Sequence, residues 1–277
     1  MIRTAMLLSL LTAILLAAGF LFAGILGMTF AFIIALVINF VSYWYSDKIV
    51  LRLYGAKPAE DKELIAMVGH LAREAEIPAP KVYIVPSEVP NAFATGRSPK
   101  HGAVAVTQGL KALNSEEIEA VIAHEIAHIK NRDTLVQTVA ATIAGAISYL
   151  AQIGYWSMFA DKERDRGGML GLVLIVIFAP LAALLIRMAI SRRREYDADY
   201  GGAIFSKKPL ALASALKKIS SIAAQNPIEG SSATSHLWIV NPFTRNWFTT
   251  LFSTHPPIER RITKLERMAG RKDEGND

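Results

Sequence analysis

The stretch AHEIAHIKNRD, residues 123–133, decides the fold and the chemistry of this chain. It contains His124, Glu125 and His128 in the order HExxH. On a helix, this spacing places both imidazoles on one face about 6 Å apart, so that they can share one metal ion, with Glu125 beside them as the catalytic carboxylate. Two histidines that only line a polar helix face are the alternative. Asp133, at the end of the motif, is expected to pair with an arginine.

A hydrolytic zinc site normally has three protein ligands and keeps a fourth position for water. The chain has no cysteine, so the third ligand must be His, Asp or Glu, and no HExxHxxGxxH extension follows His128. The segment RRREYDADYGGA, residues 192–203, places Glu195 and Asp199 one helical turn apart. We expect Glu195 to bind the metal and Asp199 to accept a hydrogen bond from a ligating histidine. A salt-bridged surface turn is the alternative for this pair.

The composition indicates a membrane protein, because 52% of the residues are hydrophobic and the mean hydropathy is +0.30. Between Arg3 and Asp47 about 43 residues carry no charge, roughly twice the length of one helical span. Gly24 and Gly27 lie where a two-span hairpin would turn. A cleaved signal peptide is the alternative, but it would leave the second half of this stretch unexplained.

Two further uncharged stretches, residues 134–160 and 167–186, are each long enough to span a membrane. Buried core helices are the alternative for this pair, because Pro180 and Arg187 weaken the second span. Lysines and arginines flank the apolar runs, which places the N-terminus and both long polar segments in the cytoplasm by the positive-inside rule. The same placement of cations makes the net charge of +6 typical of a membrane surface and not of nucleic-acid binding.

The expected fold is therefore mainly α-helical, with about four transmembrane helices and a cytosolic α+β domain that contains a small sheet. The expected parts are a transmembrane hairpin at 1–46, half of the cytosolic domain at 47–133, a second hairpin at 134–190, and the other half at 191–277 with a flexible tail. In the cytosolic parts the patterns predict helices after Asp61, around 210–223 and around 257–268, and strands at 82–85 and 103–107. Asn114 and Glu117 form a capping box before the motif helix.

The segments HEIAHIKNRD, EYDADYGGA and THPPIERRI together resemble the HtpX family of membrane zinc metalloproteases, a bacterial and archaeal branch related to the CAAX prenyl proteases. The resemblance covers nearly the whole chain, including VPNAFATG at 89–96. It implies a zincin-like fold of the Glu-zincin type, with one zinc ion per subunit on His124, His128 and Glu195 and with Glu125 as the catalytic carboxylate. It also implies cleavage of misfolded or damaged membrane proteins at the cytoplasmic face of the cell membrane, in quality control and the stress response, and self-cleavage is compatible with it.

Two more segments are candidates for the site. His255, in STHPPIE, is a candidate donor to the oxyanion of the tetrahedral intermediate. The alternative is that Thr254 caps a helix begun by the prolines and that His255 is incidental. The resemblance also suggests that Asn91, Ala92 and Phe93 border the cleft and align an extended substrate by strand addition, and an ordinary turn and strand is the alternative there.

Other functions fit the sequence less well. A zinc-binding scaffold without activity would have four closed protein ligands and no use for Glu125. A narrow peptide-processing protease, such as a prenyl-peptide protease, is the closer alternative, but the compact chain leaves no room for a large intramembrane chamber. A transporter is disfavoured because the first three expected spans carry no charge.

Overall fold

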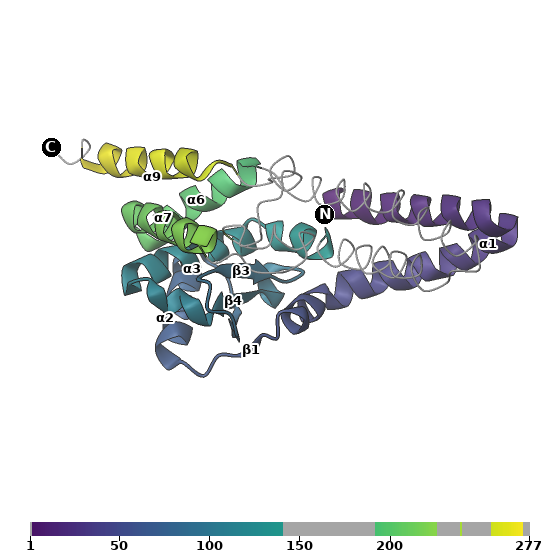
Figure 1. Cartoon of the computed structure of the whole chain (residues 1–277), viewed down its shortest axis with the longest axis horizontal. Coiled ribbons are helices and arrows are strands. Elements are labelled where there is room, and N and C mark those ends of the chain that lie inside the picture. The colour runs from purple at the N-terminus through teal and green to yellow at the C-terminus, as the bar shows by residue number, and fades with distance from the viewer. Residues whose placement is uncertain (1, 141–191, 226–238, 240–255, 274–277) are drawn as a thin grey trace.

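The computed structural model describes residues 2–140, 192–225, 239 and 256–273. An N-terminal helical hairpin extends from one end of a globular part in which helices pack on a small sheet (Figure 1). Of the predicted second membrane hairpin, only residues 134–140 are described, and they are helical. The rest of that hairpin, His255 and the last four residues lie outside the described part of the chain.

Helix α1, Ile2–Leu53, consists of two arms joined at a kink at Ala23 and Gly24. Gly24 has φ 59°, a conformation that glycine adopts without strain. The arms then pack backbone to backbone, because a Cβ atom at Gly19 would collide with the carbonyl group of Gly27, and the reverse also holds. The chain therefore turns back at the predicted glycines.

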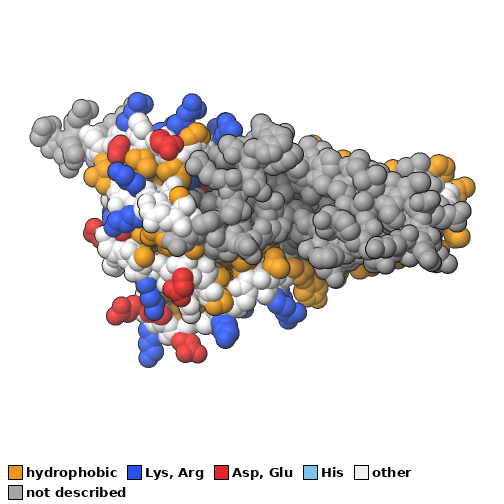
Figure 2. Space-filling view, viewed as in Figure 1, with side chains coloured by type: hydrophobic (Ala, Val, Ile, Leu, Met, Phe, Trp, Pro, Cys, Tyr) orange, Lys and Arg blue, Asp and Glu red, His pale blue; other side chains and the backbone are white. Residues whose placement is uncertain are grey.

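The second arm, Ala23–Leu53, is the one helix among the described residues that is long and apolar enough to cross a membrane. Figure 2 shows hydrophobic side chains at the outer end of the hairpin and charged side chains over the globular part. Large exposed hydrophobic side chains are concentrated on this arm, as a lipid-facing helix requires. The two spans predicted for residues 1–46 thus correspond to one full-length apolar arm and a first arm with a shorter apolar stretch, Thr4–Ala17.

The sheet contains four strands in the order β1-β2-β4-β3. They are β1 Lys57–Pro58, β2 Lys81–Val85, β3 Ala92–Thr95 and β4 Ala103–Thr107. The two predicted strands, β2 and β4, form the parallel centre, and β1 pairs antiparallel with β2. Strand β3, which the sequence patterns did not reveal, pairs antiparallel with β4 and forms an edge of the sheet.

The two faces of the sheet have different partners, because side chains alternate along each strand. Ala92, Ala94 and Val104 lie in the main core together with the apolar side of the motif helix. Phe93 points the other way, into a smaller cluster with the end of α1, where its ring lies 5.4 Å from that of Tyr54. The sheet therefore joins the hairpin to the helical layer.

Five helices of at least 13 residues make up the described helical layer. They are α2 Lys62–Glu74, α3 Ser115–Lys130, α6 Arg192–Ser206, α7 Pro209–Gln225 and α9 Ile258–Asp273, and short 3-10 turns at Pro99–His101 and Gln108–Ala112 flank β4. Helix α2 begins after Asp61, as predicted, and the side chain of Asp61 caps it by accepting hydrogen bonds from two backbone N–H groups. Helix α3 carries the HExxH motif and lies centrally among the others.

The capping box predicted for α3 is present and also ties α3 to α7. The Asn114 side chain accepts from the N–H of Glu117 at 2.9 Å, and the Glu117 carboxylate accepts from the N–H of Asn114 at 3.0 Å. Lys218 and Ser214 of α7 donate to the same carboxylate at 2.9 and 2.7 Å. Burial works to raise the pKa of Glu117, but these donors outweigh it and lower the pKa. Glu117 therefore both caps the start of α3 and joins this helix to α7, on the N-terminal side of the HExxH motif.

Candidate metal centre

Helix α6 packs directly on the motif helix because two glycines face it. A Cβ atom on Gly202 would lie 2.8 Å from both Cα and N of His124, and a Cβ atom on Gly201 would lie 2.9 Å from Cβ of Ala127. These separations leave no room for a side chain, so the two helices are in backbone contact. The GG of the YDADYGGA segment therefore lets α6 bring Glu195 to the HExxH motif.

His124, His128 and Glu195 form a buried cluster whose potential ligand atoms all lie within 4.8 Å of one another. Nε2 of His128 is 3.5 Å from one oxygen of Glu195, and Nε2 of His124 is 4.0 Å from the other. Ligands about 2.0–2.1 Å from a tetrahedral zinc ion are separated by roughly 3.3 Å, so a small contraction would bring these atoms to bonding distance. The two imidazole nitrogens and one carboxylate thus fit a divalent metal ion, and they are the donor types expected of a hydrolytic zinc site.

Each histidine has a carboxylate at its far nitrogen. Nδ1 of His124 lies 3.1 Å from Asp199, and Nδ1 of His128 lies 3.3 Å from Asp133. A carboxylate in this position holds a ligating imidazole in one tautomer and orientation, with Nε2 directed at the metal. The sequence led us to expect this contact for Asp199. It led us to expect only an arginine partner for Asp133, which is Arg194 at 3.4 Å, and the HxxxxD spacing after the motif was the signal that was missed.

Arg261 of α9 is the principal site residue that sequence reasoning missed. Its side chain is fully buried and donates from Nε and Nη2 to the two oxygens of Asp199, at 2.8 and 2.6 Å. Its Nη1 lies 3.6 Å from Glu195 and donates to the backbone carbonyl of Ile239 at 3.2 Å. In the sequence Arg261 looks like its exposed neighbour Arg260, and only the packing of α9 separates them.

The ionisation of these groups follows from burial and charge. Burial would raise the pKa of Asp199, but the Arg261 guanidinium outweighs it and lowers the pKa to about 2, so Asp199 is a carboxylate at neutral pH. Burial lowers the pKa of His124, which keeps its ring neutral. Burial also lowers the pKa of His128, but the carboxylates of Asp133 and Glu195 have the larger effect and raise this pKa to about 9.

Glu125 projects beside the cluster and is almost fully buried. Its burial, together with the nearby Glu195 carboxylate, raises its pKa to about 7, while the backbone N–H of Ala94 in β3 donates to it. A carboxylate with a pKa near neutrality can both take and return a proton, which is the requirement for a general acid–base group. The edge strand thus contacts the group that is expected to perform the chemistry.

The predicted substrate-binding residues Asn91, Ala92 and Phe93 lie on the edge strand and in the turn before it. Asn91 is buried, and its side-chain oxygen accepts from the N–H of Ile239 at 3.1 Å and from that of Ala92 at 3.0 Å. The carbonyl of Ala92 accepts from Ile239 N–H at 3.3 Å, so Ile239 occupies this point of the sheet edge. The Phe93 side chain faces away from α3, and only its backbone belongs to the edge strand.

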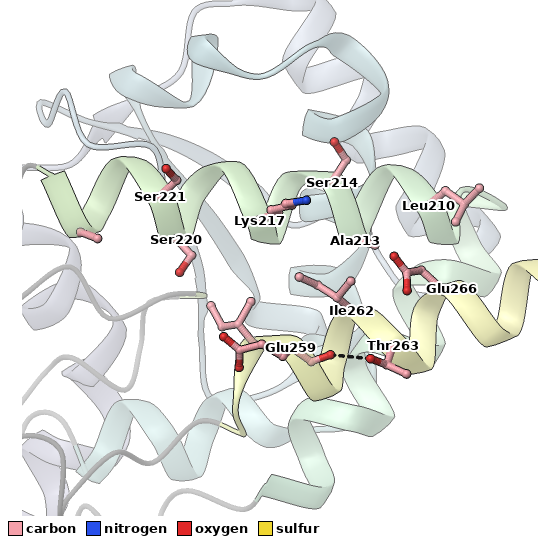
Figure 3. A pocket seen from close by; sticks show the side chains of 12 residues that line it. Leu210, Ala213, Ser214, Lys217, Ser220, Ser221, Glu259, Ile262, Thr263 and Glu266 are labelled. Carbon is pink, nitrogen blue, oxygen red and sulfur yellow. Dashed lines mark hydrogen bonds between the residues drawn. The ribbon is translucent and has the colours of Figure 1, made fainter.

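A groove of about 700 Å³ lies elsewhere, between α7 and α9 (Figure 3). Its walls carry Ser214 and Lys217 from α7 and Ile262 and Glu266 from α9, and none of the metal-cluster residues lines it. The candidate metal centre is therefore a tightly packed cluster, separate from this groove.

Comparisons with known proteins agree on one family. The model of peptidase family M48 matches residues 58–269. Curated relatives named "Protease HtpX homolog" include those of Thermococcus sibiricus, 52% identical over 97% of this chain and 96% of the relative, and Pyrococcus furiosus, 53% identical with the same coverage. A crystal structure of S. mikatae Ste24p has the same fold, with a TM-score of 0.51 and 18% identity. The alignment covers 92% of this chain but spans only 62% of that protein.

Proposed function

Because the chain belongs to peptidase family M48 and is a metalloprotease, we propose that it is a zinc endopeptidase that cleaves misfolded or damaged membrane proteins. The observation that carries the proposal is the buried cluster of His124, His128 and Glu195, with Glu125 beside it. The apolar arm Ala23–Leu53 supports a membrane location. The proposed site of cleavage is the cytoplasmic face of the cell membrane, and the proposed role is protein quality control and the stress response.

In this proposal His124, His128 and Glu195 would hold one zinc ion, which would supply a Lewis acid for the peptide carbonyl and for a water molecule. Glu125 accepts a proton from the attacking water and later donates it to the leaving amine. Its pKa of about 7 in the metal-free protein suits both steps. Asp199 and Asp133 act through the two histidines, because each fixes the orientation of one ring.

The substrate is proposed to lie along β3 as an additional strand. This strand is an edge of the described sheet, and its residue Ala94 reaches Glu125 through the backbone N–H. Strand addition uses main-chain hydrogen bonds and therefore tolerates many side chains, as a protease for unfolded proteins requires. The backbone N–H of Ile239 already donates to the carbonyl of Ala92. Pairing with the substrate is therefore proposed to begin in the part of β3 that contains Ala94.

A membrane-proximal substrate is supported by the chain path around the site. Helix α3 ends at Lys130, and the buried helical residues 133–140 that follow include the first residues of the predicted third span. The proposed four-span topology therefore places the metal centre a few residues from the bilayer. Loops and ends of damaged membrane proteins would reach it more readily than free soluble proteins, and the same nearness is compatible with self-cleavage.

The decisive test compares the wild type with Glu125→Gln, each purified in detergent and loaded with zinc, on an unfolded model protein. Cleavage by the wild type alone, abolished by a chelator and restored by zinc, is the expected result. Equal zinc content in both proteins shows that the substitution removes the base and not the metal. If both proteins bind zinc and neither cleaves more than a blank, the non-catalytic scaffold replaces the proposal.

A second test addresses the class of substrate. One unfolded sequence is presented in proteoliposomes, either fused to an unrelated transmembrane helix or free in solution. Faster cleavage of the tethered form supports membrane proteins as substrates. Equal rates for the two forms contradict that choice, and cleavage confined to one short sequence favours a narrow processing enzyme.

A further inference from the structure

Aromatic side chains gather on α1 where the apolar arm ends. Phe40, Trp44 and Tyr45 are exposed, and their rings lie close together, with 6.2 Å between the centroids of Phe40 and Trp44. Asp47 and Lys48 follow immediately and end the uncharged stretch. Tryptophan and tyrosine at the end of an apolar helix mark the level of the lipid headgroups.

The catalytic domain touches the hairpin at the same level. The guanidinium of Arg97 lies over the ring of Trp44, with 4.9 Å between its carbon and the ring centroid. Stacking of this kind stabilises an arginine beside an aromatic face while its N–H groups stay available to other acceptors. The loop at 96–102, between β3 and β4, is thereby placed at the predicted headgroup level.

Hydrogen bonds and close backbone packing hold this loop in one conformation. Gly96, at φ 130°, leaves no space for a Cβ atom against the backbone of His101, and its carbonyl accepts from the hydroxyl of Thr134 at 2.9 Å. Ser98 and His101 are joined by a side-chain hydrogen bond of 3.0 Å. The loop thus connects the edge strand, the chain that follows the metal-binding helix, and, through Arg97, the membrane hairpin.

Several cations lie in this loop and on the adjoining end of α1. In the described part of the chain, no ion pair to a carboxylate forms with Lys48, Arg52, Arg97 or Lys100. Asp47 is the acidic residue next to this group in the sequence. Residues 44–52 and 96–102 together carry these four cations and one carboxylate, and their net positive charge is complementary to lipid phosphates.

We propose that the loop at 96–102 and the adjoining end of α1 bind the phosphate of an anionic lipid headgroup, with Arg97 on Trp44 as the central contact. The lipid holds the open end of β3 at the membrane interface, where membrane-bound substrates arrive. Free phosphate lacks the acyl chains that lie against Phe40 and the apolar arm, so the ligand is a lipid in the bilayer. The inference rests on the proposed membrane location and not on peptidase activity.

The test uses the fluorescence of Trp44 in the full-length chain. Trp156, Trp238 and Trp247 are changed to Phe, and Glu125→Gln prevents self-cleavage. The protein is placed in bilayers with equal fractions of brominated phosphatidylglycerol or brominated phosphatidylcholine, whose bromine atoms quench nearby tryptophan. Stronger quenching by the anionic lipid is expected. Each cation should favour binding of the anionic lipid over phosphatidylcholine roughly fivefold, which corresponds to the attraction of about 1 kcal/mol per Lys or Arg near an anionic surface.

Two variants identify the residue responsible. Arg97→Gln should reduce the preference for the anionic lipid about fivefold, whereas Lys111→Gln should leave it unchanged. Lys111 is an exposed cation beyond the far end of β4, which begins next to the loop and runs away from it. Zinc content equal to that of the parent shows that each variant is folded.

The outcomes separate the two proposals. Quenching by both lipids without preference, or a preference that survives Arg97→Gln, overturns the lipid site while the membrane location stands. No quenching by either lipid overturns the headgroup placement of Trp44 and with it the lipid site. An inactive wild-type enzyme that still shows the Arg97-dependent preference refutes the proposed function and supports the lipid site.

Discussion

Arg261 and Asp199 form a two-point ion pair inside the protein, with N–O distances of 2.8 and 2.6 Å and no exposed surface on the arginine. The same Asp199 lies 3.1 Å from His124, so α9 acts on the metal-binding helix through α6. A planar guanidinium matches a carboxylate in this geometry, and a lysine does not. The pair therefore helps to fix the position of His124 through Asp199, which lies beside its ring.

Replacing Arg261 should weaken metal binding. Arg261→Lys keeps the charge but loses the two-point contact, so Asp199 is held less firmly and His124 with it. We expect zinc affinity to fall roughly 10- to 100-fold, as for other residues that orient a metal ligand. Competition with a chromophoric chelator measures the affinity, and Arg260→Lys, at the exposed neighbour, is the control. Parent-like affinity in Arg261→Lys would show that the pair only stabilises the fold.

Asp133→Asn should have a similar effect through the other histidine. The substitution weakens the contact with His128 Nδ1 at 3.3 Å and removes the charge partner of Arg194. Zinc affinity is expected to decrease about 10-fold or more. Asp197→Asn is a matched control, because Asp197 is exposed and, in the described part of the chain, its one ion pair is with the exposed Arg193 at 3.9 Å. Equal affinities of the two variants contradict a positioning role for Asp133.

Gly202→Ala should disturb the metal centre without touching a ligand. The new Cβ would lie 2.8 Å from the backbone of His124, so α6 must move away from α3 and carry Glu195 with it. Overpacking of this kind costs about 1–3 kcal/mol, and we expect zinc affinity to fall at least about tenfold. Gly270→Ala, where no described atom beyond the adjoining backbone of α9 lies within 4 Å of the new Cβ, should behave as the parent in chelator competition and thermal unfolding. A Gly202→Ala protein with normal zinc affinity would mean that the helices need not touch.

Zinc binding should release a proton from His128. In the metal-free protein its pKa is about 9, because nearby carboxylates outweigh the effect of burial. A protonated ring cannot bind metal, so the apparent affinity should fall roughly tenfold for each pH unit below 9 and level off above it. Calorimetry at about pH 8, in buffers with different ionisation heats, counts the proton. Identical heats in all buffers would contradict the prediction.

Glu117→Ala should lower stability, because it removes half of the capping box and the acceptor of Lys218 and Ser214. The expected loss in the free energy of unfolding is about 1–2 kcal/mol. Glu116→Ala is the control, since Glu116 is exposed and its one ion pair among the described residues is with Lys208 at 3.3 Å. The apparent Tm of the zinc-loaded proteins in detergent is the measurement. If both variants have the same Tm, the network at Glu117 contributes nothing beyond surface charge.

Local patterns predicted a large part of the fold. The turn near Gly24, the helix that follows Asp61, the capping box at Asn114 and the two segments that form β2 and β4 were all visible in sequence, because each depends on residues close together in the chain. Strand β3 was missed because AFAT is short and buried on both faces, so no alternation of polar and apolar residues marks it. The spans predicted at 134–190 remain a prediction.

The sequence by itself determined which chemistry is available: HExxH fixes the spacing of two imidazoles and one carboxylate on a helix, and the absence of cysteine narrows the third ligand to a carboxylate or a histidine. Only the tertiary structure decided that Gly202 lets Glu195 reach those imidazoles, and that Arg261 and not Arg260 holds Asp199. The reason is physical. Spacing along one helix is set by its own geometry, whereas contacts between residues 60 or more positions apart depend on how closely whole helices pack.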